Sequence, residues 1–190
     1  MIELIFATNN VHKLQEVREI MGSRFRILSM KDVGLDIGIP EDQDTIEGNA
    51  RQKARFVFEK TGKDCFADDT GLFVDILDGR PGVFSARYAG ENCDFDDNIR
   101  KLLSEIDGLE NRKANFRCVV CLIYQGKEYC FEGRIDGKIT CERKGNTGFG
   151  YDPVFLPDGS QQTFAEMPPY LKNGISHRGM AISRLLRFFK

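Results

Sequence analysis

The chain has 190 residues, of which 41% are hydrophobic, so it is long enough and apolar enough to bury a core as one domain or as two lobes that share a core. Its 27 lysines and arginines nearly balance its 29 aspartates and glutamates. The net charge of -2 therefore argues against a nucleic-acid or membrane partner, and an anionic ligand would have to meet a local group of basic side chains.

The N-terminal residues, Met1 to Ala7, lack a basic leader and are too short for a signal peptide, so we interpret them as a first strand. No apolar run in the sequence has the length of a membrane span. The chain does not need disulfides, and Cys118 and Cys121 lie three residues apart on an expected strand, which points their thiols to opposite faces. We therefore expect a cytoplasmic protein with reduced cysteines. A Cys/His zinc site is not expected, because the sequence has two histidines.

A polar turn joins the first strand, Glu3 to Thr8, to a helix that the apolar spacing predicts from Val11 to Met21. The polar residues at this turn are Thr8, Asn9, Asn10 and Lys13. Backbone N–H groups and the helix dipole at such a turn favour a phosphate, and Lys13 adds a full charge. A plain N-cap followed by a solvated lysine is the alternative. The turn is not a Walker A loop, because the chain contains no G-K-[S/T].

A second strand is expected from Arg26 to Met30, and the next helix from Asn49 to Lys60. Small residues at Ala50 and Ala54 would let this helix approach a sheet closely. Lys53 lies at the edge of the same face, and we expect its side chain to be solvated, as most lysines are.

Two adjacent carboxylates, Asp68 and Asp69, interrupt the apolar run from Phe66 to Val74. Burying an ionised carboxylate costs several kcal/mol unless a cation or hydrogen-bond donors compensate it. We therefore expect the pair at the end of a strand, facing a ligand, with Leu72 to Ile76 as a short strand. A surface turn is the alternative, because Asp, Thr and Gly are common turn residues.

The middle of the chain predicts a helix from Asp94 to Ile106, whose acidic first turn is interpreted as capping and not as a metal site. A hairpin follows, with strands at Phe116–Tyr124 and Lys127–Arg134, and Gly137–Cys141 is expected as a third antiparallel strand. Alternating strands and helices followed by a meander predict an α/β protein with a mixed sheet.

A glycine-rich segment, Lys144 to Phe155, places three glycines around Phe149 and Tyr151. The glycines would let the backbone approach a flat ligand while one of the two rings stacks on it. A flexible surface loop is the alternative, although exposing two large aromatic side chains would be costly without a partner. The spacing is not G-x-G-x-x-G, so no dinucleotide-binding fold is predicted.

The last helix is expected from Gly179 to Phe189, with Ser176 as its N-cap and with His177 and Arg178 in the first turn. This position is unfavourable for a cation, because it faces the positive end of the helix dipole. We therefore expect Arg178 to serve an acceptor or an anion.

Five blocks of the sequence, in order, resemble the inosine/xanthosine triphosphate pyrophosphatase family, also called the Ham1-like or RdgB-like family. The blocks are Ala7–Lys13, Phe66–Leu72, Pro81–Tyr88, Gly148–Phe155 and Ser176–Arg178. They span nearly the whole chain, so their combination is far more specific than any one of them. The resemblance implies one domain, residues 1–190, with an elongated mixed sheet flanked by helices and two lobes about a central cleft.

The resemblance also implies a homodimeric, magnesium-dependent enzyme that hydrolyses ITP, dITP and XTP to the monophosphate and pyrophosphate. By matching position, Asp69 is the proton acceptor, Glu41 and Asp69 hold Mg²⁺, and Lys13 helps to stabilise the leaving pyrophosphate. The residues that hold the triphosphate are Thr8, Asn9, Asn10, Val11, His12 and Lys13. The other implied substrate contacts are Thr70, Phe149, Gly150, Tyr151, Asp152, Lys172, His177 and Arg178.

The chain departs from the family pattern at a few positions. Thr70 stands where many members have Ser, and Asn9 where Gly is frequent. The segment 44–49 lacks the usual aromatic residue, which weakens the local alignment around Glu41. Two other functions remain as alternatives. A nucleotide sensor on the same fold would not need the acidic residues, and a nucleic-acid-binding protein would need a basic face.

Overall fold

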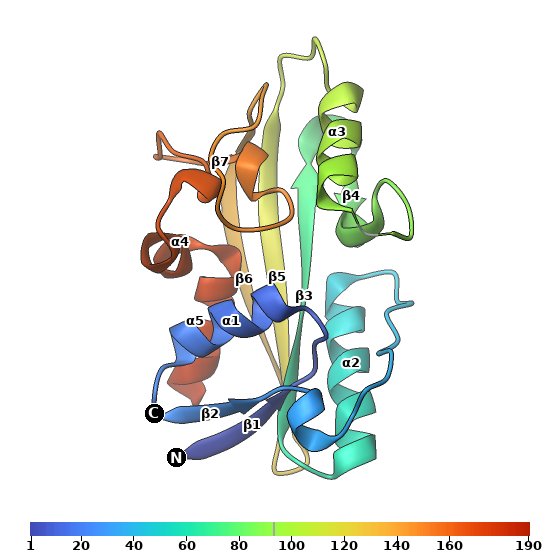
Figure 1. Ribbon diagram of the computed structural model, residues 1–190, viewed down its shortest axis with the longest axis vertical. Helices are drawn as coiled ribbons and strands as arrows, with labels where there is room; N and C mark the ends of the chain where they lie inside the picture. Colours follow the sequence, from blue (N-terminus) through green and yellow to red (C-terminus); the bar gives the residue numbers. More distant parts are fainter. Residues whose placement is uncertain (93) are drawn as a thin grey trace. The chain divides into compact units, whose positions relative to one another are not determined.

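The computed structural model describes residues 1–92 and 94–190 (Figure 1). The chain divides into two compact units. Unit 1 consists of Met1–Asp69, Cys118–Gly133 and Arg178–Lys190. Unit 2 consists of Thr70–Arg117 and Arg134–His177. In these described residues, no helix is long and apolar enough to cross a membrane.

Among the described residues, seven strands form a mixed sheet in the order β2-β1-β3-β5-β6-β7, with β4 paired to β3. The strands are β1 (Ile2–Phe6), β2 (Phe25–Leu28), β3 (Cys65–Val74), β4 (Pro81–Gly82), β5 (Lys113–Tyr124), β6 (Lys127–Ile139) and β7 (Phe155–Pro157). Strand β1 is parallel to β2 and β3, whereas β4 is antiparallel to β3 and β7 is antiparallel to β6. The mixed α/β sheet is therefore confirmed.

The helices begin and end largely where the sequence places its caps. They are α1 (Val11–Met21), α2 (Ile46–Thr61), α3 (Phe95–Glu105), α4 (Pro169–Ile175) and α5 (His177–Phe188). The Asp94 carboxylate accepts a hydrogen bond from the Asp97 N–H at 2.8 Å, so the acidic first turn of α3 is a cap, as predicted. Gly62 ends α2 in the left-handed conformation that glycine adopts without strain.

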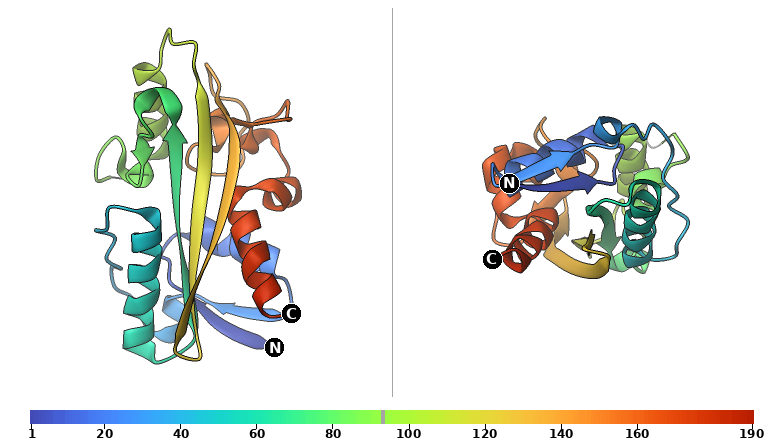
Figure 2. Two further views of the ribbon diagram at one scale, coloured as in Figure 1. Left: turned by 180° about the vertical axis from the view of Figure 1, so that it is seen from behind. Right: turned by 90° about the horizontal axis from the view of Figure 1, so that it is seen from below.

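In unit 1, helices cover both faces of the sheet, with α1 and α5 on one face and α2 on the other (Figures 1 and 2). Phe6, Phe66 and Cys118 pack in the same apolar cluster as residues of α1 and α5. On the other face, the Cys65 thiol lies 3.3 Å from the Ala54 carbonyl oxygen. The small residues of α2 thus allow the close approach to the sheet that the sequence predicts.

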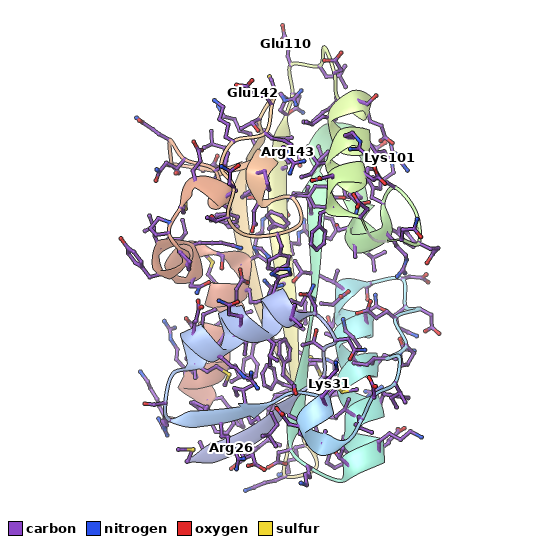
Figure 3. All side chains as sticks on the ribbon, in the orientation of Figure 1. Arg26, Lys31, Lys101, Glu110, Glu142 and Arg143 are labelled. Carbon is purple, nitrogen blue, oxygen red and sulfur yellow. The ribbon has the colours of Figure 1, made fainter. Side chains whose placement is uncertain are left out.

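Unit 2 has its own apolar cluster, in which Ile99 and Leu102 of α3 pack with Phe116 and Phe155. The Phe116 and Phe155 rings meet edge to face, with centroids 4.7 Å apart. A polar contact also holds α3 in place. Lys101, which is labelled in Figure 3, donates a hydrogen bond to the Tyr88 carbonyl oxygen at 2.6 Å.

The structure differs from the sequence prediction at two strands. Asp68 and Asp69 are not at a strand end, because β3 continues through them to Val74. Gly137–Cys141 is not a separate strand, because β6 continues to Ile139 and pairs there with β7. Both differences have one cause: a strand persists wherever its backbone groups find partners, and these partners lie far away in the sequence.

Phe66 tests the core of unit 1, because it is fully buried and its ring stacks on Phe6 with centroids 4.6 Å apart. Phe66→Ala should lower the free energy of unfolding by about 3–5 kcal/mol, since it removes a buried ring and leaves a cavity. Phe84→Ala is the matched control, because its ring is 54% exposed, and it should cost less than about 1 kcal/mol. Urea denaturation measures both, and equal losses would contradict this assignment of the core.

Candidate functional site

The turn between β1 and α1 is held by two polar side chains. The Asn10 side-chain oxygen accepts hydrogen bonds from the N–H groups of His12 and Lys13, at 2.9 and 3.2 Å. The Thr8 hydroxyl oxygen accepts one from the Asn10 N–H at 3.1 Å. Asn10 is therefore the N-cap of α1. A phosphate bound here would have to displace this side chain or use other donors, among them the Lys13 ammonium.

Asp68 lies on β3 and faces α1 and α5, with 1% of its surface exposed. Lys13 Nζ donates to its Oδ1 at 3.0 Å, and Arg178 Nε donates to its Oδ2 at 2.9 Å. Burial alone would raise the pKa of Asp68, but the two cations outweigh it and hold the pKa well below its usual range. The ionised carboxylate therefore fixes the positions of two basic side chains.

Arg178 stands in the first turn of α5 and is also buried. Besides its bond to Asp68, its Nη1 donates to Glu16 Oε2 at 2.6 Å. Burial would lower the pKa of Arg178, but the two carboxylates raise it overall. The expectation that this cation serves an acceptor is confirmed, and the acceptors Asp68 and Glu16 are protein carboxylates.

Asp69 points to the opposite face of the sheet, toward α2, because side chains alternate along a strand. Lys53 Nζ donates to its Oδ1 at 3.0 Å, and Asn49 Nδ2 donates to its Oδ2 at 3.2 Å. Burial raises the pKa of Asp69, and the neighbouring Lys53 opposes this effect only in part. Two consecutive carboxyl groups thus have pKa values shifted in opposite directions.

The expectation that Lys53 is solvated is wrong. Its side chain is 3% exposed and pairs with both Asp69 and Glu41. Burial would lower the pKa of Lys53, but the two carboxylates raise it overall. The sequence holds a signal for this contact, because Asn49 and Lys53 are spaced one helical turn apart among the small residues of a buried face.

Glu41 and Asp69 both pair with the Lys53 ammonium, so a metal ion held by their oxygens would have to take the place of one of these contacts. Carboxylate oxygens suit Mg²⁺, which binds proteins through one or two such groups and completes its shell with water and substrate phosphates. The two residues therefore fit the metal that the resemblance implies.

In unit 2, Asp152 holds the glycine-rich segment in place. Its Oδ2 accepts hydrogen bonds from Lys172 Nζ at 2.6 Å and from the Phe149 N–H at 2.9 Å. Gly148 has a φ of 76°, and a Cβ there would lie 2.2 Å from the same oxygen. Asp152 and Lys172 are both buried, so this segment is built around a buried ion pair.

The aromatic rings of this segment have different environments. Phe149 is half-buried, and its ring centroid lies 5.0 Å from Lys172 Nζ. Tyr151 belongs to the core, where its hydroxyl donates to the Ser85 carbonyl oxygen at 3.0 Å and burial raises its pKa. Phe149 is therefore the more exposed of the two rings and the better placed to stack on a ligand. His177 is buried, and its ring stacks on that of Phe116 with centroids 4.5 Å apart.

The candidate residues thus fall into two groups. The group in unit 1 contains Thr8, Asn9, Asn10, Val11, His12, Lys13, Glu41, Asp69 and Arg178. The group in unit 2 contains Thr70, Phe149, Gly150, Tyr151, Asp152, Lys172 and His177. Two peptide bonds, Asp69–Thr70 and His177–Arg178, join the groups along the chain. Asn49, Lys53 and Asp68 are additional polar residues at the unit 1 group.

Comparison with known proteins decides the family, because the sequence model of the Ham1 family matches residues 4–188. The chain belongs to the Ham1 family. This membership confirms the resemblance seen in the five sequence blocks. The Ham1 match covers nearly the whole chain, so both groups of candidate residues lie within it.

Individual Ham1 relatives agree over their full length. A protein of Flavobacterium psychrophilum named dITP/XTP pyrophosphatase is 50% identical over 189 residues, covering 100% of both chains. One of the same name from Porphyromonas gingivalis is 50% identical and covers 99% of this chain and 97% of its own. The solved structure of a HAM1 protein from Coxiella burnetii has a TM-score of 0.90 at 35% identity, over 100% of this chain and 98% of that one. The expected fold class is therefore confirmed.

The buried carboxylate of Asp68 gives a prediction about stability. Asp68→Asn should lower the free energy of unfolding by about 3–5 kcal/mol at neutral pH, because the half-buried Lys13 and the buried Arg178 both lose the carboxylate charge that they share. The pKa of Asp68 is lower in the folded state than its unfolded value of about 3.9. The ionised carboxylate therefore contributes its full share to the free energy of unfolding above about pH 3.9. The contribution is lost as the pH falls toward the folded pKa.

Urea denaturation at neutral pH and near pH 3 measures this effect. The difference between the wild type and Asp68→Asn should shrink at the lower pH. Asp36→Asn is the control, because Asp36 is exposed, and it should leave stability nearly unchanged. If Asp68→Asn lowers the free energy of unfolding equally at both pH values, the conclusion that Asp68 is ionised in the folded protein is contradicted.

Proposed function

We propose that this protein hydrolyses the non-standard purine nucleoside triphosphates ITP, dITP and XTP to the monophosphate and pyrophosphate. The observation that carries the proposal is the Asp69, Lys53 and Glu41 group, found in a chain that is 50% identical over its whole length to a dITP/XTP pyrophosphatase. Such a group combines a candidate base with candidate metal ligands, which a nucleotide sensor would not need.

Asp69 is the proposed acceptor of the proton from the water that attacks the α-phosphorus. Its burial raises its pKa, which makes it a stronger base than an exposed aspartate. Asn49 and Lys53 each hold one of its oxygens, so α2 fixes its orientation. Glu41 and Asp69 would hold Mg²⁺, which when bound neutralises phosphate charge and lowers the pKa of a bound water.

Lys13 is proposed to stabilise the leaving pyrophosphate, together with the turn residues 8–12. An ammonium group carries three N–H donors, and the contact with Asp68 uses one of them. Asp68 does not itself take part in the chemistry in this proposal. It is a positioning residue that fixes Lys13 and Arg178.

The group in unit 2 is proposed to bind the purine. Phe149 would stack on the base beside the Lys172 ammonium. Inosine and xanthosine carry a 6-oxo acceptor, which backbone N–H groups or the His177–Arg178 pair would meet. Adenine presents a 6-amino group, so each donor left unpaired would cost about 1–3 kcal/mol. The remaining proposed contacts are Thr70, Gly150, Tyr151 and Asp152.

We extend the proposal to the assembly. Residues 1–190 act as one catalytic domain, because each unit is made of separate chain segments and neither is a continuous piece. The homodimer and the cytoplasmic location stay predictions, the first from the resemblance and the second from the sequence. Sedimentation equilibrium measures the first of these directly.

A pyrophosphate-release screen tests the activity. With Mg²⁺, the protein should turn over ITP, dITP and XTP at least about tenfold faster than dATP, which corresponds to one unpaired buried donor. It should also turn them over faster than dGTP, whose 2-amino group, and not its 6-oxo group, distinguishes it from dITP. EDTA should stop the reaction. Equal rates on standard and non-standard nucleotides would contradict the proposed selectivity, and binding of dITP without release would favour the nucleotide sensor.

Asp69→Asn tests the proposed base. This change should lower kcat by about 10²–10⁴-fold, the range for loss of a general base, while calorimetry still detects dITP binding. Asp75→Asn is the matched control, because Asp75 is an exposed carboxylate, and it should keep full activity. A fully active Asp69→Asn variant would remove Asp69 from the mechanism.

A further inference from the structure

Two cysteines that the proposed function does not use face each other across the hairpin of β5 and β6, in unit 1. The two-residue turn at Gln125–Gly126 sets the register in which Cys121 lies opposite Cys130. The hydrogen bond from the Ile139 N–H to the Arg112 carbonyl oxygen, at 2.9 Å, keeps the same register farther along the hairpin.

This cross-strand pair has the spacing that a disulfide needs. Opposite residues of an antiparallel hairpin alternate between hydrogen-bonded and non-hydrogen-bonded pairs. Arg112 and Ile139 form a hydrogen-bonded pair, and Cys121 lies an odd number of residues along the same strand. Cys121 and Cys130 are therefore a non-hydrogen-bonded pair. Cα atoms in such pairs are about 4.5 Å apart, and disulfides join Cα atoms roughly 4.4–6.8 Å apart. The two sulfur atoms lie within 4.8 Å of each other. The bond therefore requires little movement of the backbone.

Two arginines of α2 lie beside the pair. Arg51 and Arg55 both pair with Glu128, the neighbouring acidic side chain, and Arg55 Nε does so at 2.8 Å. Arg51 Nη2 is also held by Glu47, at 2.8 Å. The arginines are fixed by these contacts, so their positive charge stays close to the sulfur atoms.

The two thiols differ in acidity. The hydrogen bond between them, supported by Arg51, lowers the pKa of Cys130, while burial, Glu47 and Glu132 oppose the shift. The same hydrogen bond, together with burial, raises the pKa of Cys121. Cys130, which is half-buried, therefore forms the thiolate first, and the buried Cys121 keeps its proton.

A metal site is the competing interpretation, because Cys121, Glu128 and Cys130 have possible ligand atoms within 4.8 Å of one another. A divalent cation would have to displace the guanidinium groups of Arg51 and Arg55 from the Glu128 carboxylate. The same two charges would repel it. They attract an anionic thiolate instead, so the surroundings favour thiol chemistry.

We propose that Cys130 and Cys121 are a peroxide-reactive dithiol, in which Cys130 is oxidised first and Cys121 closes a disulfide. The Cys130 thiolate attacks hydrogen peroxide, so that an S–O bond forms, the O–O bond breaks and hydroxide leaves. Cys121 sulfur then attacks the sulfenic sulfur, the S–S bond forms, and the displaced hydroxide takes the Cys121 proton as water. The two sulfurs lose two electrons, which the peroxide gains.

Peptide mapping of the full-length protein tests this proposal. The reduced protein is treated with one equivalent of hydrogen peroxide in EDTA, quenched with N-ethylmaleimide and digested. We expect a peptide cross-linked between Cys121 and Cys130 that dithiothreitol releases. Before oxidation, Cys130 should be alkylated severalfold faster than the exposed Cys141, because Cys121 and Arg51 stabilise the Cys130 thiolate.

Variants separate the two roles. Cys121→Ser should stop at the sulfenic acid, seen as a dimedone adduct on Cys130, and Cys130→Ser should give neither adduct nor cross-link. Arg51→Gln should slow alkylation of Cys130 and leave Cys141 unchanged. Cys65, whose pKa burial raises to about 12, is the unreactive control.

The wild-type protein alone can overturn the proposal. Absence of the cross-link, or alkylation of Cys130 no faster than that of Cys141, would contradict it. One equivalent of zinc that copurifies without EDTA and protects both thiols would assign the group to a metal instead.

Discussion

Two consecutive carboxylates buried in one strand need separate partners, because alternation along the strand sends them to opposite faces of the sheet. Asp68 has Lys13 and Arg178 on one face, and Asp69 has Lys53 on the other. Leaving either charge unpaired would cost several kcal/mol. The placement of α1, α5 and α2 in unit 1 is therefore fixed by charge as well as by apolar packing, since each face requires the cation that its helices bring.

The same arrangement gives two chemically identical side chains different properties. Asp68 has two cations in contact and keeps its charge, whereas burial dominates at Asp69 and raises its affinity for a proton. Neighbouring acids with pKa values pushed apart are typical of sites in which one acid is structural and the other accepts a proton. The proposed division of labour thus rests on the surroundings of each carboxylate and not on the residue type.

Local patterns were sufficient to predict much of the fold. The apolar spacing places α1 at Val11–Met21, and the acidic turn after Asp94 is a cap, because both depend on residues within a few positions of each other. The course of β3 was not predictable in this way. Arg178, which pairs with the Asp68 carboxylate, lies 110 positions away in the sequence. A prediction from neighbouring residues therefore treats Asp68 as an unpaired acid and places the end of the strand there. Lys53 was misplaced for the same reason, because its two partners are set by the tertiary fold.

The last segment of the chain completes a unit that begins with the first. Arg24 donates to the Phe189 carbonyl oxygen at 2.7 Å, and Ala181 and Leu185 of α5 pack in the cluster that contains Leu4. During synthesis α5 leaves the ribosome after the other segments of unit 1, so the core of unit 1 stays incomplete until α5 has emerged. A nascent chain cut short before α5 would expose apolar surface and an uncompensated acid, which are features that chaperones and proteases recognise.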